Sequence, residues 1–303
     1  MGRLESEGSS SPGCSNTMIV DAHQHFWDPA RGDYGWLTPD LPIHRVYGPG
    51  DLRPLMDAAG VDASILVQAA PSSAETDYML EIACRTPWVL GVVGWIDLEA
   101  PDAAAQVRAR TEDPLFLGVR PMLQDIAQAD WILRRELEPA LVAIAGERLV
   151  FDALVRSHQI GVVDELARRH SGLSIVLDHG AKPKLGDRMA MTQWREEMTK
   201  LARRPNIACK LSGLLTELPP DGDPALAHLA IDTLFDLFGP ARLLWGRDWP
   251  VLTLARCKDG AGDYRRWHEQ ARAAIAARDA AAVAAVMGAN AARLYRPSRR
   301  IRV

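Results

Sequence analysis

The sequence predicts an α/β fold, a (β/α)8 barrel in which eight strands alternate with helices. Two observations lead to this prediction. Eight short apolar runs recur along the chain of 303 residues, and segments with helical start or stop signals lie between most of them. Short runs that are apolar throughout are typical of parallel strands covered on both faces. An open, doubly wound sheet is the alternative, but it offers no reason for eight repeats.

The eight predicted strands are rich in Leu, Ile and Val, as buried parallel strands usually are. They cover residues 18–26, 63–69, 89–96, 116–122, 148–154, 173–179, 207–213 and 242–249. The loop of residues 28–47 follows the first strand and carries Tyr34 and Trp36. We expect this aromatic loop to cover the mouth of the barrel.

The predicted helices are marked by residues that commonly begin or end a helix. Gly60 follows the first helix as a C-terminal cap, Ser72 or Ser73 precedes the second, and Pro101 lies at the start of the third. Pro205 follows the sixth, and a residue before proline disfavours helix. The helices cover residues 51–59, 74–85, 102–110, 131–145, 162–170, 193–203 and 224–238, and 264–277 and 280–295 after the last strand.

Composition indicates an ordinary globular protein, with 48% hydrophobic and 24% charged residues. The formal net charge of −4 gives no basic excess, so we expect neither nucleic acid nor an anionic membrane as a partner. No apolar run reaches transmembrane length. The four cysteines are scattered and form no CxxC pair, so neither a zinc ribbon nor a disulfide framework is expected and a cytoplasmic location fits.

The first 17 residues, MGRLESEGSSSPGCSNT, are polar and rich in Ser and Gly. They lack the apolar core of a signal peptide, so residues 1–17 are predicted to be a flexible leader or a tag. Met18 is then a plausible natural start. No linker or break in composition divides the remainder, and residues 18–303 are predicted to form a single domain.

Polar or aromatic side chains follow nearly every predicted strand at its carboxyl end, where barrel enzymes carry their active sites. Each one alone has an ordinary structural explanation, such as a packed histidine, a helix cap or a structural ion pair. A barrel would bring all of them to one rim, and this convergence favours a functional site. They are His23, His25, Trp27, Gln68, Trp95, Asp97, Arg120, Gln124, Asp152, Asp178, His179, Lys182, Lys210, Ser212, Asp248 and Trp249.

His23 and His25 lie two residues apart, so both imidazoles point to the same face of a strand. Together with Asp248 they offer two nitrogens and a carboxylate, a donor set that suits one Zn²⁺ with an open position. His179 is a candidate fourth ligand, or a group that polarises a carbonyl. The alternative is that Asp248 acts as a general base on water without any metal. Arg120 ends the fourth strand where a bridging carboxylate would be needed, so at most one metal is expected.

The motifs DAHQHFWD, VQA, VVGWIDL, GVRPMLQD, VLDHGAKP, CKLSGL and WGRDWPV occur in this order. Together they resemble the hallmark segments of the lactonase-like branch of the amidohydrolase superfamily, which includes L-fuconolactonase-type and L-rhamnonolactonase-type enzymes. The 2-pyrone-4,6-dicarboxylate lactonases and 4-sulfomuconolactone hydrolases are more distant members. The closing segment GANAARLYR also resembles this branch, so the similarity extends from Met18 to Tyr295.

The resemblance implies a distorted (β/α)8 barrel that hydrolyses a lactone ring. It assigns the activation of water to Asp248, and it places His23, His25 and His179 against the lactone carbonyl. Some members work with a divalent metal and others without, so both alternatives stay open. The residues matched to the substrate pocket are Trp27, Gln68, Trp95, Arg120, Gln124, Asp152 and Lys182.

Three segments depart from the pattern of the branch. Arg247 replaces the usual small residue in GRDWP, and it either faces outward from the strand or binds an anionic substrate group. The sixth-strand motif reads DHGAKP where DHxGKP is usual. Residues 156–158, Arg-Ser-His, have no match.

The leading hypothesis is therefore a hydrolase for the lactone of a sugar acid, of the L-fucono-, L-rhamnono- or galactono- type. Its partner is a small-molecule lactone, and a homo-oligomer is compatible with the chain. The second hypothesis is a zinc-dependent decarboxylase of the related barrels. The third is a binding protein without catalytic activity.

Overall fold

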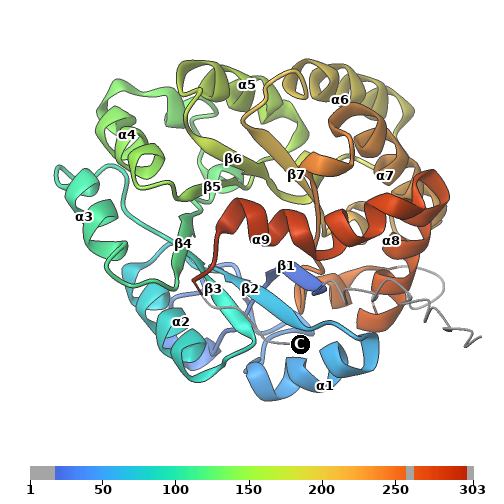
Figure 1. Cartoon of the computed structure of the whole chain (residues 1–303), viewed down its shortest axis with the longest axis horizontal. Helices are drawn as coiled ribbons and strands as arrows, with labels where there is room; N and C mark the ends of the chain where they lie inside the picture. Colours follow the sequence, from blue (N-terminus) through green and yellow to red (C-terminus); the bar gives the residue numbers. More distant parts are fainter. Residues whose placement is uncertain (1–17, 257–262, 299–303) are drawn as a thin grey trace, which may run out of the picture.

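The predicted barrel is confirmed. In the computed structural model, which describes residues 18–256 and 263–298, the strands form one parallel sheet in the order β1 to β8 (Figure 1). The strands are β1 Val20–Gln24, β2 Ala63–Val67, β3 Val89–Gly94, β4 Phe116–Val119, β5 Val150–Ala153, β6 Ser174–Leu177, β7 Ile207–Leu211 and β8 Leu243–Trp245.

The barrel closes where the segment after β8 meets β1. The amide of Asp248 donates to the carbonyl oxygen of His23 at 2.7 Å, and the amide of His25 donates to Trp249 at 2.8 Å. These two hydrogen bonds form a seam between the first and last parts of the barrel. The seam also brings Asp248 beside the two histidines of β1.

Helices surround the sheet, as Figure 1 shows, and cover its outer face. The principal ones are α1 Pro49–Ala59, α2 Ser73–Arg85, α3 Ala103–Arg110, α4 Glu138–Gly146, α5 Ile160–Arg169, α6 Arg188–Leu201, α7 Ala225–Phe238, α8 Tyr264–Arg278 and α9 Asn290–Tyr295. None of the helices within the described residues combines the length and apolar character that a bilayer span requires.

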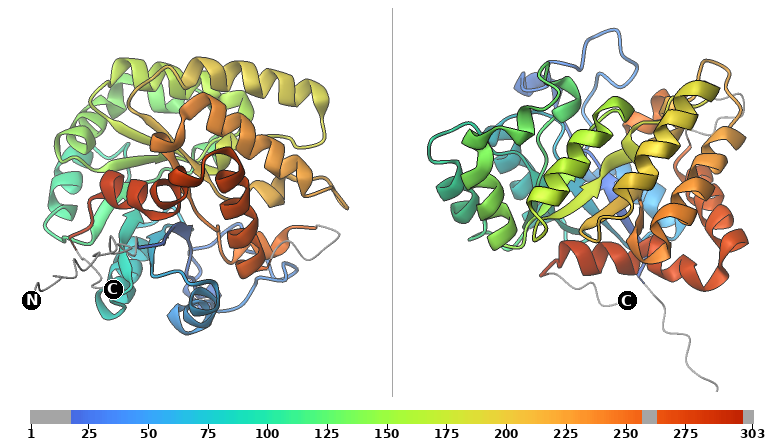
Figure 2. Two further views of the ribbon diagram at one scale, coloured as in Figure 1. Left: turned by 45° about the vertical axis from the view of Figure 1, so that its right-hand side comes forward. Right: turned by 90° about the horizontal axis from the view of Figure 1, so that it is seen from above.

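Two apolar layers stabilise the barrel. Alternate strand residues, such as Val150 and Val176, fill the interior, while their neighbours pack against the surrounding helices. Helix α9 contributes Ala291 and Tyr295 to the interior layer. In the right-hand view of Figure 2, α9 lies at one end of the barrel and the loop after β1 projects from the other. The carboxyl ends of the strands therefore remain the end available for a site.

The predicted elements differ from the observed ones mainly at their ends. The fourth and eighth strands were expected to reach residues 122 and 249, but they end at Val119 and Trp245. The polar residues beyond them lie in turns. The helix expected at 131–145 begins only at Glu138, because Arg134 is extended and two short 3-10 turns precede Pro139.

The helix expected at 280–295 is also interrupted. A 3-10 turn at Ala280–Ala282 and a π-helical turn at Ala285–Ala289 precede α9. The interruption lies where the chain packs closely against the start of β1, since a Cβ on Gly288 would come within 1.9 Å of the Met18 carbonyl oxygen and 3.3 Å of the Val20 amide nitrogen. Residues 1–17, with the predicted leader and Cys14, lie outside the described residues, as does Cys257.

Candidate active site

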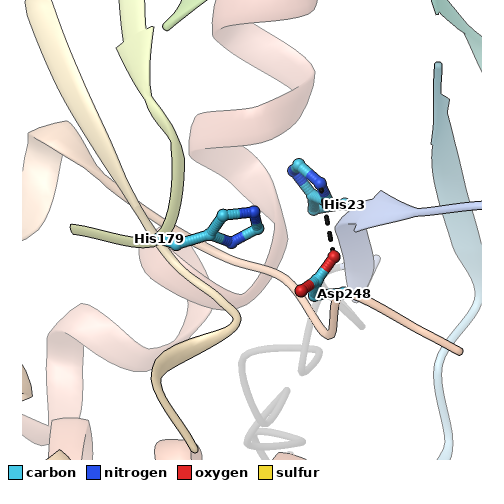
Figure 3. A group of neighbouring side chains, drawn as sticks. All are labelled: His23, His179 and Asp248. Atoms are coloured by element: carbon cyan, nitrogen blue, oxygen red, sulfur yellow. Dashed lines mark ion pairs between the residues drawn. The ribbon is translucent and has the colours of Figure 1, made fainter. Parts of the chain in front are cut away.

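Three side chains from distant parts of the sequence converge at the carboxyl end of the barrel (Figure 3). His23 comes from β1, His179 from the turn after β6, and Asp248 from the segment after β8. One ligand atom from each lies within 4.8 Å of the others. His23 Nε2 is 3.6 Å from Asp248 Oδ1, and His25 Nε2 is 3.1 Å from the same oxygen. The three histidines therefore surround one carboxylate.

His25 has a defined orientation. Its Nδ1 lies 2.7 Å from the carbonyl oxygen of Val67, which can only accept, so Nδ1 carries the proton. In the neutral ring, Nε2 then presents its lone pair to Asp248 Oδ1. Two acceptors that face each other at 3.1 Å need a proton or a cation between them. Metal-binding histidines commonly donate their other ring N–H to a backbone carbonyl, as His25 does here. These residues therefore fit a divalent metal.

The backbone around the site adopts conformations that are uncommon for residues other than glycine. His179 has φ 53° and Asp248 has φ 62°, and the residues from His179 to Lys182 all have positive φ. Such conformations persist only where the surroundings hold them, and they concentrate at functional sites. Gly213 lies against both residues, because a Cβ there would be 2.6 Å from His179 Nδ1 and 3.0 Å from Asp248 Oδ2.

Charge and burial set the protonation of these groups. Burial disfavours the imidazolium form and lowers the pKa of His179 to about 4, so the ring is neutral at neutral pH. Burial alone would raise the pKa of Asp248, but the neighbouring imidazoles of His179, His25 and His23 outweigh burial and hold that pKa well below its usual range. The site thus presents an ionised carboxylate beside neutral imidazole nitrogen.

A buried ionic network lies beneath His23. Lys210 Nζ is 3.1 Å from His23 Nδ1 and 3.0 Å from Asp178 Oδ1, and it forms an ion pair with Asp152. Arg120 pairs with the other oxygen of Asp178 at 3.2 Å. The hydroxyl of Tyr295 donates to Asp152 at 2.7 Å. Buried charges need such partners, so the network fixes the surroundings of His23.

Comparison with known proteins identifies the family. A family model described as amidohydrolase matches residues 20–296, nearly the whole of the barrel. This chain belongs to the amidohydrolase family. The resemblance expected from its motifs is confirmed.

Among curated relatives, the amidohydrolase is 42% identical to an L-fucono-1,5-lactonase of Burkholderia ambifaria, with 93% of this chain and 97% of the relative covered. It is 36% identical to an L-fucono-1,5-lactonase of Burkholderia multivorans, with 92% and 96% covered. An amidohydrolase of Burkholderia multivorans, solved with bound zinc, superposes with a TM-score of 0.82 at 33% identity and covers 92% of this chain and 99% of its own. A 5-carboxyvanillate decarboxylase of Sphingomonas paucimobilis shares the fold alone, at 17% identity and a TM-score of 0.63.

The substrate-pocket residues expected from the resemblance occupy different depths in the amidohydrolase. Gln68 is buried, its side-chain amide donates to the Arg120 backbone carbonyl, and the backbone carbonyl of Gln68 accepts from the Arg120 guanidinium. Asp152 is fully buried in the ionic network. Trp27 is also fully buried, with its ring 6.3 Å from that of His25 between centroids. These three residues are therefore buried beneath the site and support its shape.

Arg120 is buried as well. The three remaining pocket residues predicted from the resemblance lie at or near the surface. Trp95 lines a hollow of about 710 Å³ together with Trp36 and Trp131. Lys182 lines a second hollow, of about 230 Å³. Gln124 is partly buried, and its side-chain amide lies 3.3 Å from Asp125.

Arg247 faces away from the site. Its side chain is buried, its guanidinium lies 4.9 Å from the centre of the Tyr264 ring, and it donates to the Asp263 carbonyl. The outward-facing alternative for Arg247 is therefore confirmed.

Sequence reasoning did not assign a role to Tyr295 or Gly213. Tyr295 lies 143 positions from Asp152, and no local pattern relates the two residues. Gly213 ends the predicted seventh strand, and its position there was the only signal available.

Proposed function

We propose that this amidohydrolase opens the ring of a sugar-acid lactone by hydrolysis, and that L-fucono-1,5-lactone is the first substrate to test. One observation carries the proposal. An ionised carboxylate, Asp248, lies among three imidazoles at the open end of the barrel, in a chain 42% identical to an L-fucono-1,5-lactonase. The decarboxylase and the non-catalytic binding protein are not favoured by these relatives.

In the proposed reaction, Asp248 accepts a proton from water as the water oxygen attacks the lactone carbonyl carbon. Positive charge in the site stabilises the resulting oxyanion. Arg120 contributes to this charge, and its Nη1 lies 3.4 Å from His23 Nε2. The bond between the carbonyl carbon and the ring oxygen then breaks. Asp248 returns its proton to the ring oxygen, and the product is a hydroxy acid.

A divalent ion such as Zn²⁺, if held by His23, His179 and Asp248, would supply a Lewis acid for the carbonyl oxygen. The metal ligands predicted from the sequence include His25 in place of His179. His25 Nε2 also faces the carboxylate of Asp248, at Oδ1. Hydrolysis by Asp248 without a metal is the alternative. Activity with and without a chelator, and after addition of zinc, separates the two.

The test is a pH-indicator assay on L-fucono-, L-rhamnono- and galactono-lactones. Asp248→Asn keeps the size of the side chain and removes the base, so kcat should fall about 10²- to 10⁴-fold. Asp232→Asn, on the outer helix α7, is the matched control and should keep full activity. The proposal fails if no lactone is opened, or if Asp248→Asn is as active as the unchanged enzyme. Carbon dioxide release without ring opening would favour a decarboxylase.

A cytoplasmic location, a flexible leader at residues 1–17 and a homo-oligomer are further proposals that follow from composition and the resemblance. Cell fractionation, removal of the first 17 residues and light scattering of the purified protein test them in turn.

A further inference from the structure

A hollow of about 230 Å³ lies on the β5–β7 side of the barrel mouth, and most of its charged or titratable lining residues are basic. Residues after the ends of β5, β6 and β7 line it, including the unmatched segment 156–158. Its charged or titratable lining residues are Arg156, His158, Lys182, Lys184 and Glu217. The reaction described above leaves this hollow without a role.

The hollow is connected to the catalytic group through one short turn. The backbone from His179 to Lys182 is left-handed throughout, and Lys182, three residues after His179, lines the hollow. Ser157 holds the turn, with its Oγ 2.8 Å from the Lys182 carbonyl oxygen. Trp194 forms part of the wall and donates its indole N–H to Gly180 at 2.7 Å.

The cations around the hollow have no carboxylate ion-pair partner in the described part of the chain. Within residues 18–256 and 263–298, Arg156, Lys182 and Lys184 form no ion pair. Glu217 is the one acidic residue in the lining. Burial raises its pKa, although Lys182 and Arg156 act in the opposite direction. Three permanent positive charges against one carboxylate make the hollow attractive to an anion.

The opposite side of the mouth has the reverse charge. The larger hollow beside β2, β3 and β4 is walled by Trp36, Trp95 and Trp131. Its charged lining residues are Asp33, Asp97, Asp125 and Glu99. A carboxylate is repelled by these acids and attracted to the basic hollow, whereas a neutral sugar ring can pack against the tryptophans.

We propose that the basic hollow is a subsite for the carboxylate of a sugar acid. The inference rests on the proposed function, because hydrolysis of a neutral lactone creates this group. The oxygen of water forms a bond to the carbonyl carbon, the ring oxygen leaves with a proton, and the new carboxylic acid releases a proton to solvent. A lactone that already carries a carboxylate elsewhere in the molecule presents the same group to the hollow before hydrolysis.

The test is binding of L-fuconate, measured by calorimetry at constant ionic strength, with L-fucitol as the matched compound without a carboxylate. The variant Arg156→Gln/Lys184→Gln removes two charges outside the catalytic group and should weaken L-fuconate about five-fold or more. Arg203→Gln/Lys200→Gln removes two exposed charges near the opposite end of α6 and should leave the affinity unchanged. The KM for L-fucono-1,5-lactone, which is neutral, should stay within about two-fold in both variants.

Equal affinity of L-fuconate for the unchanged enzyme and the Arg156→Gln/Lys184→Gln variant would overturn the subsite, as would equal binding of L-fucitol and L-fuconate. Galactaro-1,4-lactone, which carries a free carboxylate, distinguishes a subsite for a substrate carboxylate from a subsite for the product carboxylate. If the KM for galactaro-1,4-lactone rises only in Arg156→Gln/Lys184→Gln, the subsite holds a carboxylate of the substrate. If this variant weakens only the binding of L-fuconate, the subsite holds the carboxylate of the product. If no lactone is opened but L-fuconate binding depends on the hollow, the proposed function fails and the subsite stands.

Discussion

The hydroxyl of Tyr295 donates a hydrogen bond of 2.7 Å to Asp152, across 143 positions of sequence. Tyr295 ends α9, which packs against the end of the barrel opposite the site. Asp152 in turn pairs with Lys210, and Lys210 contacts His23 Nδ1 at 3.1 Å. The last helix of the fold is thus linked to a candidate catalytic histidine through three buried polar contacts.

Tyr295→Phe should therefore affect both stability and catalysis. It leaves Asp152 with one partner fewer in a fully buried position, which costs about 1–3 kcal/mol in the free energy of unfolding. We expect kcat to fall more than KM rises, because the change reaches the substrate only through His23. Urea unfolding and steady-state kinetics measure the two effects. Tyr78→Phe is the control, since Tyr78 is half-buried and its hydroxyl donates no hydrogen bond within the described residues. Unchanged stability and kcat in Tyr295→Phe would refute the link.

Gly213→Ala should impair the site while the fold persists. The backbone at Gly213 has φ 59°, and the added Cβ would lie 2.6 Å from His179 Nδ1. His179 must move away, so we expect kcat to fall about 10²-fold and the free energy of unfolding to fall by about 1–3 kcal/mol. Gly172→Ala is the matched control, because nothing lies within 4 Å of its Cβ position and its φ is not in the left-handed region. Full activity in Gly213→Ala would show that His179 is not needed in its present position.

Glu75 should make stability depend on pH. Burial raises its pKa to about 8 from an ordinary value of 4.5, while its Oε1 accepts from the Ala69 amide. A raised carboxyl pKa contributes fully to stability below about pH 4.5, and the contribution is lost as the pH rises towards 8. Glu75→Gln cannot ionise, so its free energy of unfolding relative to that of the unchanged protein should rise by about 3–4 kcal/mol between pH 5 and pH 8.5.

Urea unfolding of the two proteins at these pH values checks the prediction. Glu81→Gln is the control, since Glu81 is exposed on the same helix and should show no such gain. A difference between Glu75→Gln and the unchanged protein that is the same at both pH values would contradict it.

Metal binding should be visible in thermal stability. If a divalent cation lies between the imidazoles and Asp248, Zn²⁺ should raise Tm, and an excess of chelator should reverse the increase. The increase should vanish in Asp248→Asn and persist in Asp232→Asn. Equal increases in both variants would indicate that zinc binds elsewhere, and no increase in the unchanged enzyme would favour hydrolysis without a metal.

Much of the architecture follows from local sequence patterns. The apolar runs of the eight strands are local, and each was placed correctly because a strand buried on both faces needs no partner information to be recognised. The ends were less accurate. The run at residues 242–249 continues as LLWGRDW, yet the strand ends at Trp245, because Asp248 turns into a left-handed conformation that its surroundings impose.

The candidate site could be predicted in part for the same reason. His23, His25, His179 and Asp248 follow strands, so the barrel alone brings them together. The residues that hold these side chains in place make contacts across long stretches of sequence, such as Lys210 with His23 and Tyr295 with Asp152. No local pattern predicts such contacts. The outward orientation of Arg247 is also a tertiary property, since Tyr264 and Asp263 receive its side chain.

The seam between His23 and Asp248 has a consequence for the order in which the protein matures. During synthesis, β1 leaves the ribosome long before the segment after β8, yet the two share the hydrogen bonds that close the barrel. The long-range pairing is expected to be slow, and the exposed edge of β1 is open to incorrect partners until it forms. A nascent chain therefore holds its histidines without their carboxylate, and hydrolytic competence begins only when the final part of the chain has emerged.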